Sequence, residues 1–177
     1  MQELVNTHAV QRDGEDLLAD RVAAVQWLRN AAKQWGKTLG QPSPRLELSE
    51  SDHRKLLELR SVVAGLLAIP VDQRAEGTPV GTRVKVAANV VCDDEGRVGL
   101  EPVGKGSDWV ESAVWSEILL AQRAGTWSRL KLCREPGCRS AFYDTSRNHS
   151  GVWHNVHICG NITNLRASRS RRKTDAQ

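Results

Sequence analysis

Apolar residues recur every three or four positions in several stretches of the chain, which is the spacing of a helix with one buried face. The first stretch, residues 20–35, carries them at Val25, Leu28, Ala32 and Trp35. We expect Asp20 to cap this helix and Gly36 to end it. The second, about residues 50–68, begins with Ser49 and Asp52 at the spacing of a capping box, and Pro70 ends it.

A third helix is predicted over residues 109–124, with Ser107 or Asp108 as its cap and Gly125 as its end. The valine-rich segment before it, residues 84–103, predicts a β-hairpin that turns at 93–96. A short helix over 80–90, before the hairpin, is a further expectation for this segment. Cys92 stands alone on that arm, and we expect it to be a buried free cysteine.

Gly, Pro and Thr predict loops at 41–45 and 75–82, and the last segment, about 160–173, is expected to be helical at its start and frayed at its end. These elements define an α+β fold that is mainly α. A helical N-terminal domain with a small β-hairpin spans residues 1–128, and a C-terminal zinc-finger module spans residues 129–177.

The 177 residues contain no apolar run of about 18 positions that could span a membrane. The first residues lack the basic and apolar regions of a secretory signal, so we expect a reducing cytoplasm. In that compartment clustered cysteines bind metal more often than they form disulfides.

Positive charge is concentrated at the C-terminal end. From Lys131 onward there are nine Lys/Arg against three Asp/Glu, a net charge of +6, whereas residues 1–130 carry −2. A solvated basic terminus is one explanation, and contact with a polyanion such as nucleic acid is the other.

Candidate metal ligands lie in the same basic segment. Cys133 and Cys138 are separated by four residues that include Pro-Gly, and His154 and Cys159 repeat this gap after 15 intervening residues. Two such pairs predict a closed tetrahedral Cys₃His site for Zn²⁺. His157 and then His149 are the rival imidazoles. A cysteine–histidine hydrolase would need a thiolate beside a base, and no cysteine here is singled out in that way. A redox pair at Cys133 and Cys138 is the other alternative.

The run from Cys133 to Asn161, with "FYDTSRN" at 142–148 and Trp153, resembles the CGNR zinc-finger family of bacterial proteins. That family joins a C-terminal finger to an N-terminal domain called ABATE, and its members are described as stress-induced transcriptional regulators. "LVNTH" at 4–8 resembles the start of ABATE, and "DLLADRVAAVQWL" and "LLELRSVVAGLL" resemble its first two helices.

The resemblance maps the family's zinc-binding cysteines onto Cys133, Cys138 and Cys159, and its third cysteine falls on His154. The signature Cys-Gly-Asn-Arg ends in Ile162 here. The arginines usual before the tryptophan are replaced by Ser-Gly-Val at 150–152. These losses of positive charge imply weaker or differently placed DNA binding than in a typical member.

Cationic residues that remain for phosphate contact are Arg147, Arg166, Arg169, Arg171, Arg172 and Lys173. Outside the finger, Asn6, Thr7 and His8 form either a capped turn after a short strand or part of a small-molecule pocket. The sequence therefore predicts a cytoplasmic, non-enzymatic transcriptional regulator that binds DNA, with a small-molecule effector and a homodimer as further expectations. The alternative is a zinc-stabilised sensing or protein-interaction module that does not bind DNA.

Overall fold

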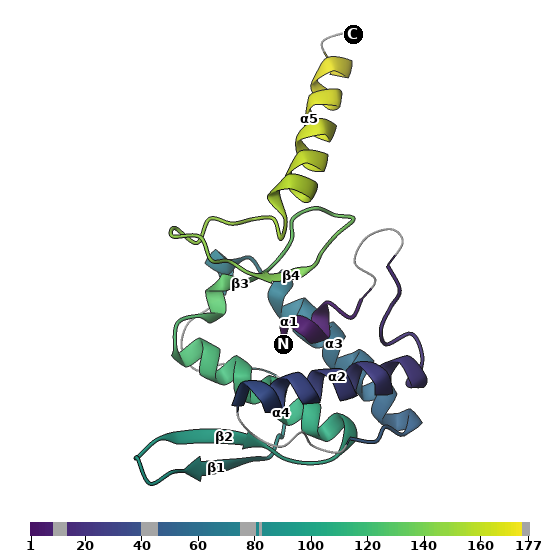
Figure 1. Cartoon of the computed structure of the whole chain (residues 1–177). Coiled ribbons are helices and arrows are strands. Elements are labelled where there is room, and N and C mark those ends of the chain that lie inside the picture. The colour runs from purple at the N-terminus through teal and green to yellow at the C-terminus, as the bar shows by residue number, and fades with distance from the viewer. Residues whose placement is uncertain (9–13, 40–45, 75–80, 82, 175–177) are drawn as a thin grey trace.

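A computed structural model describes residues 1–8, 14–39, 46–74, 81 and 83–174. Its fold is α+β and mainly α, as the sequence predicted, with two small hairpins (Figure 1). A helical body lies between the two ends of the molecule. One hairpin extends from the body at one end, and the C-terminal helix projects from the other end beyond the second hairpin.

Helices α2 (Arg21–Leu39) and α3 (Glu50–Ala68) begin directly after the capping residues that the sequence predicts, Asp20 and Ser49. Asp20 Oδ1 accepts a hydrogen bond of 2.9 Å from the backbone N–H of Ala23. Ser49 and Asp52 form the reciprocal capping box, so both predicted starts are confirmed. The predicted end of the first helix is wrong, because α2 continues through a buried Gly36 to Leu39.

Helix α4 (Gly106–Arg123) begins earlier than predicted. Its N-cap position is Lys105, which makes no side-chain cap, so neither Ser107 nor Asp108 caps it. Gly106 has a φ of +53°, and a Cβ there would lie 2.7 Å from the carbonyl oxygen of Glu47. Only glycine fits at this junction, where the start of α4 meets the start of α3.

The core is formed where α2, α3 and α4 pack together with the short N-terminal helix α1 (Gln2–Val5). Its fully buried side chains include Leu4, Leu18, Leu28, Leu56 and Val63. Trp35 of α2 meets Trp109 of α4 edge to face, with ring centroids 5.1 Å apart. The apolar residues that recur at helical spacing in the sequence therefore form the buried faces of these helices.

The first hairpin pairs β1 (Ala88–Cys92) with β2 (Val98–Pro102) in antiparallel register. This confirms the hairpin. The short helix expected over 80–90, before the hairpin, is wrong, because residues 83–87 are not helical and 88–90 belong to β1. Every residue of β1 is exposed, so the prediction that Cys92 is buried is wrong. The hairpin projects from the body (Figure 1).

The second hairpin pairs β3 (Leu130–Leu132) with β4 (Ala141–Tyr143). The single helical turn η2 (Trp127–Arg129) leads into β3, and η1 (Val71–Gln73) follows α3. Leu130 and Ala141 are buried in the same core as α1 and α3. The finger therefore shares apolar packing with the helical body, while the predicted boundary at residue 128 stays a prediction.

After β4 the chain forms a long loop, a π-helical turn η3 (Val156–Gly160) and helix α5 (Asn161–Thr174). The predicted frayed end is wrong, because the helix continues to Thr174. The expected loops at 41–45 and 75–82 lie almost wholly outside the described residues. No described helix is both long enough and apolar enough to cross a bilayer.

Candidate metal centre

The first two candidate ligands lie on a tight knuckle that begins where β3 ends. The N–H of Cys133 donates to the carbonyl of Ser140 over 2.8 Å, and the N–H of Cys138 donates to the carbonyl of Glu135 over 2.9 Å. These bonds fold the segment back on itself, so that both thiols are buried and face the same space. Pro136 and Gly137 occupy the turn between them, as the sequence indicated.

The other two ligands come from the loop and the π-helical turn before α5. Asn155 caps this turn, because its Oδ1 accepts from the N–H of Ile158 over 3.0 Å. The carbonyl of Asn155 also accepts from the N–H of Cys159 over 2.9 Å. The turn therefore brings Cys159 back beside His154, and Trp153 packs against the three buried thiols.

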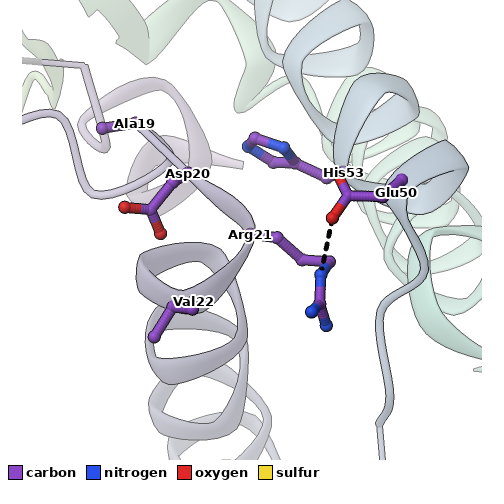
Figure 2. A pocket seen from close by; sticks show the side chains of 6 residues that line it. All are labelled: Ala19, Asp20, Arg21, Val22, Glu50 and His53. Atoms are coloured by element: carbon purple, nitrogen blue, oxygen red, sulfur yellow. Dashed lines mark hydrogen bonds and ion pairs between the residues drawn. The ribbon is translucent and has the colours of Figure 1, made fainter.

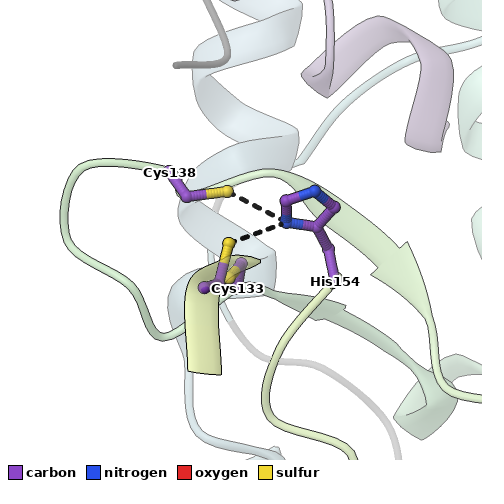
Figure 3. Close-up of side chains that lie close together, drawn as sticks. Cys133, Cys138 and His154 are labelled. Atoms are coloured by element: carbon purple, nitrogen blue, oxygen red, sulfur yellow. Dashed lines mark hydrogen bonds between the residues drawn. The ribbon is translucent and has the colours of Figure 1, made fainter. Parts of the chain in front are cut away.

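The four donor atoms of Cys133, Cys138, His154 and Cys159 lie within 4.8 Å of one another. His154 Nδ1 is 3.1 Å from Cys138 Sγ and 3.4 Å from Cys159 Sγ. Figure 3 shows the imidazole and the thiols pointing toward one another. A tetrahedral Zn²⁺ with its usual bond lengths needs donors roughly 3.5–3.8 Å apart, so the cluster has the size and the chemistry of a zinc site.

Electrostatics also favours a cation at this place. Burial raises the pKa of the Cys159 thiol to about 12, and the neighbouring Cys133 and Cys138 add to the rise. Three buried thiols side by side resist ionisation unless a cation compensates the negative charge. A bound Zn²⁺ supplies that charge, and its ligands are thiolates. The residues present therefore fit Zn²⁺.

Backbone and side-chain groups around the ligands hold the donors in place. Ser140 Oγ lies 3.0 Å from Cys138 Sγ, and the N–H of Ser140 donates to the same sulfur over 3.4 Å. Gly160 is buried next to the last ligand, and a Cβ there would lie 3.3 Å from the Trp153 ring. Such outer contacts orient the ligands of a metal site.

The loop between β4 and His154 is fixed by a buried ion pair. Lys131 Nζ donates to Asp144 Oδ2 over 2.6 Å and to the carbonyls of His149 and Gly151. Burial opposes ionisation of Asp144, but hydrogen bonds from Lys131 and Ser146 outweigh it and hold the pKa of Asp144 below its usual range. The charged pair therefore sets the path of the loop that delivers the third ligand.

The two rival imidazoles point elsewhere. His157 is exposed on the π-helical turn, outside the group of four donors. His149 is also exposed, in the loop whose path Lys131 sets. The geometry therefore selects His154 among the three histidines of the segment.

Glu135, inside the knuckle, connects the metal cluster to α5. Its side chain is 4% exposed, and Oε2 accepts from Thr163 Oγ1 over 3.0 Å while Oε1 accepts from Arg166 over 2.5 Å. The N–H of Gly137 also donates to Oε1. Glu135 therefore attaches the first turns of α5 to the knuckle.

The predicted DNA-contact residues occupy two places. Arg166, Arg169, Arg171, Arg172 and Lys173 lie on α5, and Arg147 lies on the loop after β4. The side chains of Arg147, Arg169, Arg171 and Arg172 are exposed. Arg166 differs, because its guanidinium is bound to Glu135, which makes it an anchor of the helix.

Asn6 and Thr7, predicted to form a turn or a ligand pocket, have internal partners. Asn6 pairs with the backbone of Ala141, and Thr7 is fully buried, donates to the carbonyl of Leu4 and accepts from Arg60. They follow helix α1 where a strand was expected. His8 is exposed, with Nδ1 3.9 Å from Asp16. The side chains of Asn6 and Thr7 therefore make contacts within the protein, and the ligand pocket stays a prediction.

A pocket lies instead between the N-terminal ends of α2 and α3 (Figure 2). Across it Arg21 Nε donates to Glu50 over 2.8 Å, and His53 Nε2 lies 2.8 Å from the carbonyl oxygen of Leu18. The remaining lining residues are Ala19, Asp20 and Val22. The contacts of Arg21 and His53 hold the two helix ends together, and the pocket is open to solvent.

A four-donor cluster of three thiols and one imidazole, built on a knuckle and a helical turn, defines the C-terminal segment as a zinc finger of the structural type. Residues 129–172 match the CGNR zinc finger family, in agreement with the resemblance seen in the sequence. The match begins in η2 and ends in α5, and residues 1–128 have no corresponding match. The comparison with curated proteins gave no match for the chain.

The sequence analysis missed Glu135 and the Lys131–Asp144 pair. A signal was present, since Glu135 and Asp144 are two of only three acidic residues after position 130, in a segment otherwise rich in arginine. An isolated acid within a basic segment is a candidate for a buried ion pair. Spacing alone, however, gives no indication of its partner.

Proposed function

We propose that the protein is a DNA-binding transcriptional regulator in which the zinc finger positions α5 against DNA. The observation that carries this proposal is the position of α5. The helix projects from the body (Figure 1), and its arginines at 169, 171 and 172 are exposed. An exposed helix rich in arginine is suited to contact phosphates and base edges in a groove of duplex DNA.

Bound Zn²⁺ has a structural part in this proposal. The ion joins the knuckle to the turn that precedes α5, and four protein donors leave no coordination position for a reacting water. This supports a non-enzymatic role. Arg166 and Thr163 then hold the start of the helix through Glu135. The free arginines further along the helix are the proposed phosphate contacts.

The departures from the family signature bear on affinity. Ile162 replaces the signature arginine and is 38% exposed on the first turn of α5. Each phosphate contact contributes to affinity and to its salt dependence, so the loss of this charge favours weaker binding. Arg147, on a separate loop, is a further candidate contact.

The regulatory part of the proposal rests on the helical body. Its resemblance to ABATE supports a domain that responds to a stress signal in the cytoplasm and controls the finger. Asn6 and the buried Leu130 and Ala141 connect the body to the finger, which gives a physical route between them. A small-molecule effector bound by the body is part of this proposal.

A second candidate function is a zinc-stabilised protein-interaction module that does not bind DNA. It is favoured by three exposed apolar side chains: Ile158 at 45%, Ile162 at 38% and Leu165 at 57%. Ile162 and Leu165, three positions apart, lie on one face of α5, and Ile158 precedes them on the π-helical turn η3. These side chains could pack against a partner protein instead of a nucleic acid.

The deciding experiment measures binding of the zinc-loaded protein to fluorescent duplex DNA at several salt concentrations. We expect affinity to fall steeply with salt, and the slope to decrease by about 2–3 when Arg169, Arg171 and Arg172 are changed to alanine. The matched control changes three exposed arginines of the body, Arg29, Arg54 and Arg123, to alanine. Equal losses in both triple variants would contradict α5 as the DNA contact, and no binding by the wild type would favour the protein-interaction module.

A further inference from the structure

One face of the β1–β2 hairpin consists entirely of apolar side chains. In the observed register Ala88 pairs with Pro102, Val90 with Leu100 and Cys92 with Val98. Paired residues project to the same face of an antiparallel sheet. Near the turn this face is exposed, with Val90 at 67% and Val98 at 70%. A two-stranded hairpin with an uncovered apolar face is marginally stable by itself.

The hairpin is attached to the body only near its base in the part of the chain that the structure describes. Ser112 of α4 donates to the carbonyl of Ala87 over 2.6 Å and accepts from the N–H of Val103 over 3.2 Å. Strand β2 lies on the α4 side and β1 on the outer side (Figure 1). The outer edge of β1 is therefore the edge available to another strand.

The backbone of β1 presents hydrogen-bonding groups at this edge. The N–H of Asp93 donates to the carbonyl of Arg97 over 3.0 Å, which places Asp93 among the residues whose peptide groups face β2. Since this orientation alternates along a strand, Ala88, Val90 and Cys92 direct their N–H and C=O groups outward. Exposed edges are usually protected by charges, proline or a bulge, and β1 has neither charge nor proline.

Charges on both sides of β1 identify the partner that fits. Arg83 and Lys85 precede the strand, and Asp93, Asp94 and Glu95 follow it. When two copies of such a strand meet antiparallel, the basic end of each lies beside the acidic turn of the other. Arg97 forms ion pairs with Asp93 and Glu95 and so cancels one of the three negative charges of the turn. Together with Asp94, the turn keeps a net charge of −2. A nucleic acid would be repelled by this turn.

We propose that two copies of this chain associate through antiparallel pairing of their β1 strands, with Val90 at the two-fold axis. The product is a four-stranded sheet in which the exposed apolar faces of the two hairpins become continuous. Isologous contacts of this kind are the commonest in homodimers. The hairpin lies at the opposite end of the body from α5 (Figure 1), so the dimer does not depend on DNA binding.

Sedimentation equilibrium of the zinc-loaded chain in reducing buffer tests this pairing. Val90→Pro removes an outward N–H and leaves the bonds between β1 and β2 in place. We expect the dimer to weaken at least about tenfold. Val98→Asp places a charge on the joined face and is expected to act in the same direction. Val22→Asp is the matched control, because Val22 is 75% exposed on α2 and should leave the mass unchanged.

A charge exchange tests the antiparallel register itself. With Val90 on the axis, the segment before β1 that carries Lys85 runs toward the turn of the other copy, which carries Glu95. Lys85→Glu and Glu95→Lys should each weaken the dimer, and the double variant should restore it. A wild-type chain that remains monomeric overturns the proposal. A dimer that withstands all of these substitutions also overturns it, since another surface, such as the exposed apolar side chains of η3 and α5, would then form the contact.

Discussion

The side-chain amide of Asn6 pairs with both backbone groups of Ala141, 135 positions further along the chain. Asn6 Nδ2 donates to the carbonyl of Ala141 over 2.9 Å, and the N–H of Ala141 donates to Asn6 Oδ1 over 2.7 Å. The amide thus acts like one residue of a neighbouring strand at the edge of β4. It connects the segment after the first helix of the body to the hairpin whose loop carries Cys133 and Cys138.

Replacing Asn6 with alanine should destabilise the protein. The change leaves the N–H and C=O of Ala141 without their partners at a largely buried position, and an unsatisfied buried group costs about 1–3 kcal/mol. We expect a decrease of this size in the free energy of unfolding of the zinc-loaded chain, measured by urea denaturation. His8→Ala, at an exposed neighbouring position, is the control and should change stability little. Equal stabilities of the two variants would contradict the structural role of Asn6.

Local signals allowed much of the fold to be predicted from the sequence. The capping box of Ser49 and Asp52, the cap by Asp20 and the hairpin turn at 93–96 each depend on residues close together in the chain. The errors arose where tertiary packing overrides local preference. Gly36 was expected to end α2, but it is buried within the helix.

The four donors were also predictable, because zinc ligands occur as closely spaced pairs whose gaps are visible in the sequence. The choice of His154 over His157 was settled by the turn that Asn155 caps. Contacts such as Asn6 with Ala141 and Glu135 with Arg166 were not predictable, since their partners are 135 and 31 residues away. Nothing local in the sequence marks either pairing.

Metal analysis of two histidine variants tests the donor set. His154→Ala removes the only imidazole within the described cluster and should lower zinc affinity strongly, with loss of stoichiometric metal after dialysis. His157→Ala changes an exposed side chain and should keep one zinc per chain. His154→Cys is the third arm, because it supplies a sulfur donor and should restore binding. Full zinc retention by His154→Ala would show that the fourth donor is another residue.

Glu135 should control the order of the first turns of α5. Glu135→Gln keeps the size of the side chain but removes the charge that binds Arg166, and a hydrogen bond to a charged group contributes about 1.5–3 kcal/mol. We expect faster hydrogen exchange of the amides in residues 163–168, with zinc content unchanged. Glu47→Gln, at an exposed body position, is the matched control. Unchanged exchange in the Glu135 variant would mean that the zinc site alone holds the helix.

The last prediction concerns Asp52, which joins the starts of α3 and α4. Its Oδ1 accepts from Ser107 Oγ over 2.6 Å, and its Oδ2 accepts from the N–H of Ser49 over 2.9 Å. Burial opposes ionisation, but hydrogen bonds from Ser107 and Ser49 outweigh it and lower the pKa of Asp52 to about 2. The unfolded chain binds this proton more readily, at its ordinary pKa of 3.8.

The contribution of Asp52 to stability should therefore be complete above about pH 4 and decline as the pH falls from there toward 2. Asp52→Ala should lower the free energy of unfolding by about 0.5–2 kcal/mol near pH 6, the usual range for loss of a helix cap. Thermal unfolding of both proteins between pH 6 and pH 3 measures the difference. Comparing them at each pH removes the effect of zinc release, which is common to both. Because the stabilising form is the carboxylate, the gap should narrow toward acid, and a gap that stayed constant would show that the charge of Asp52 contributes nothing.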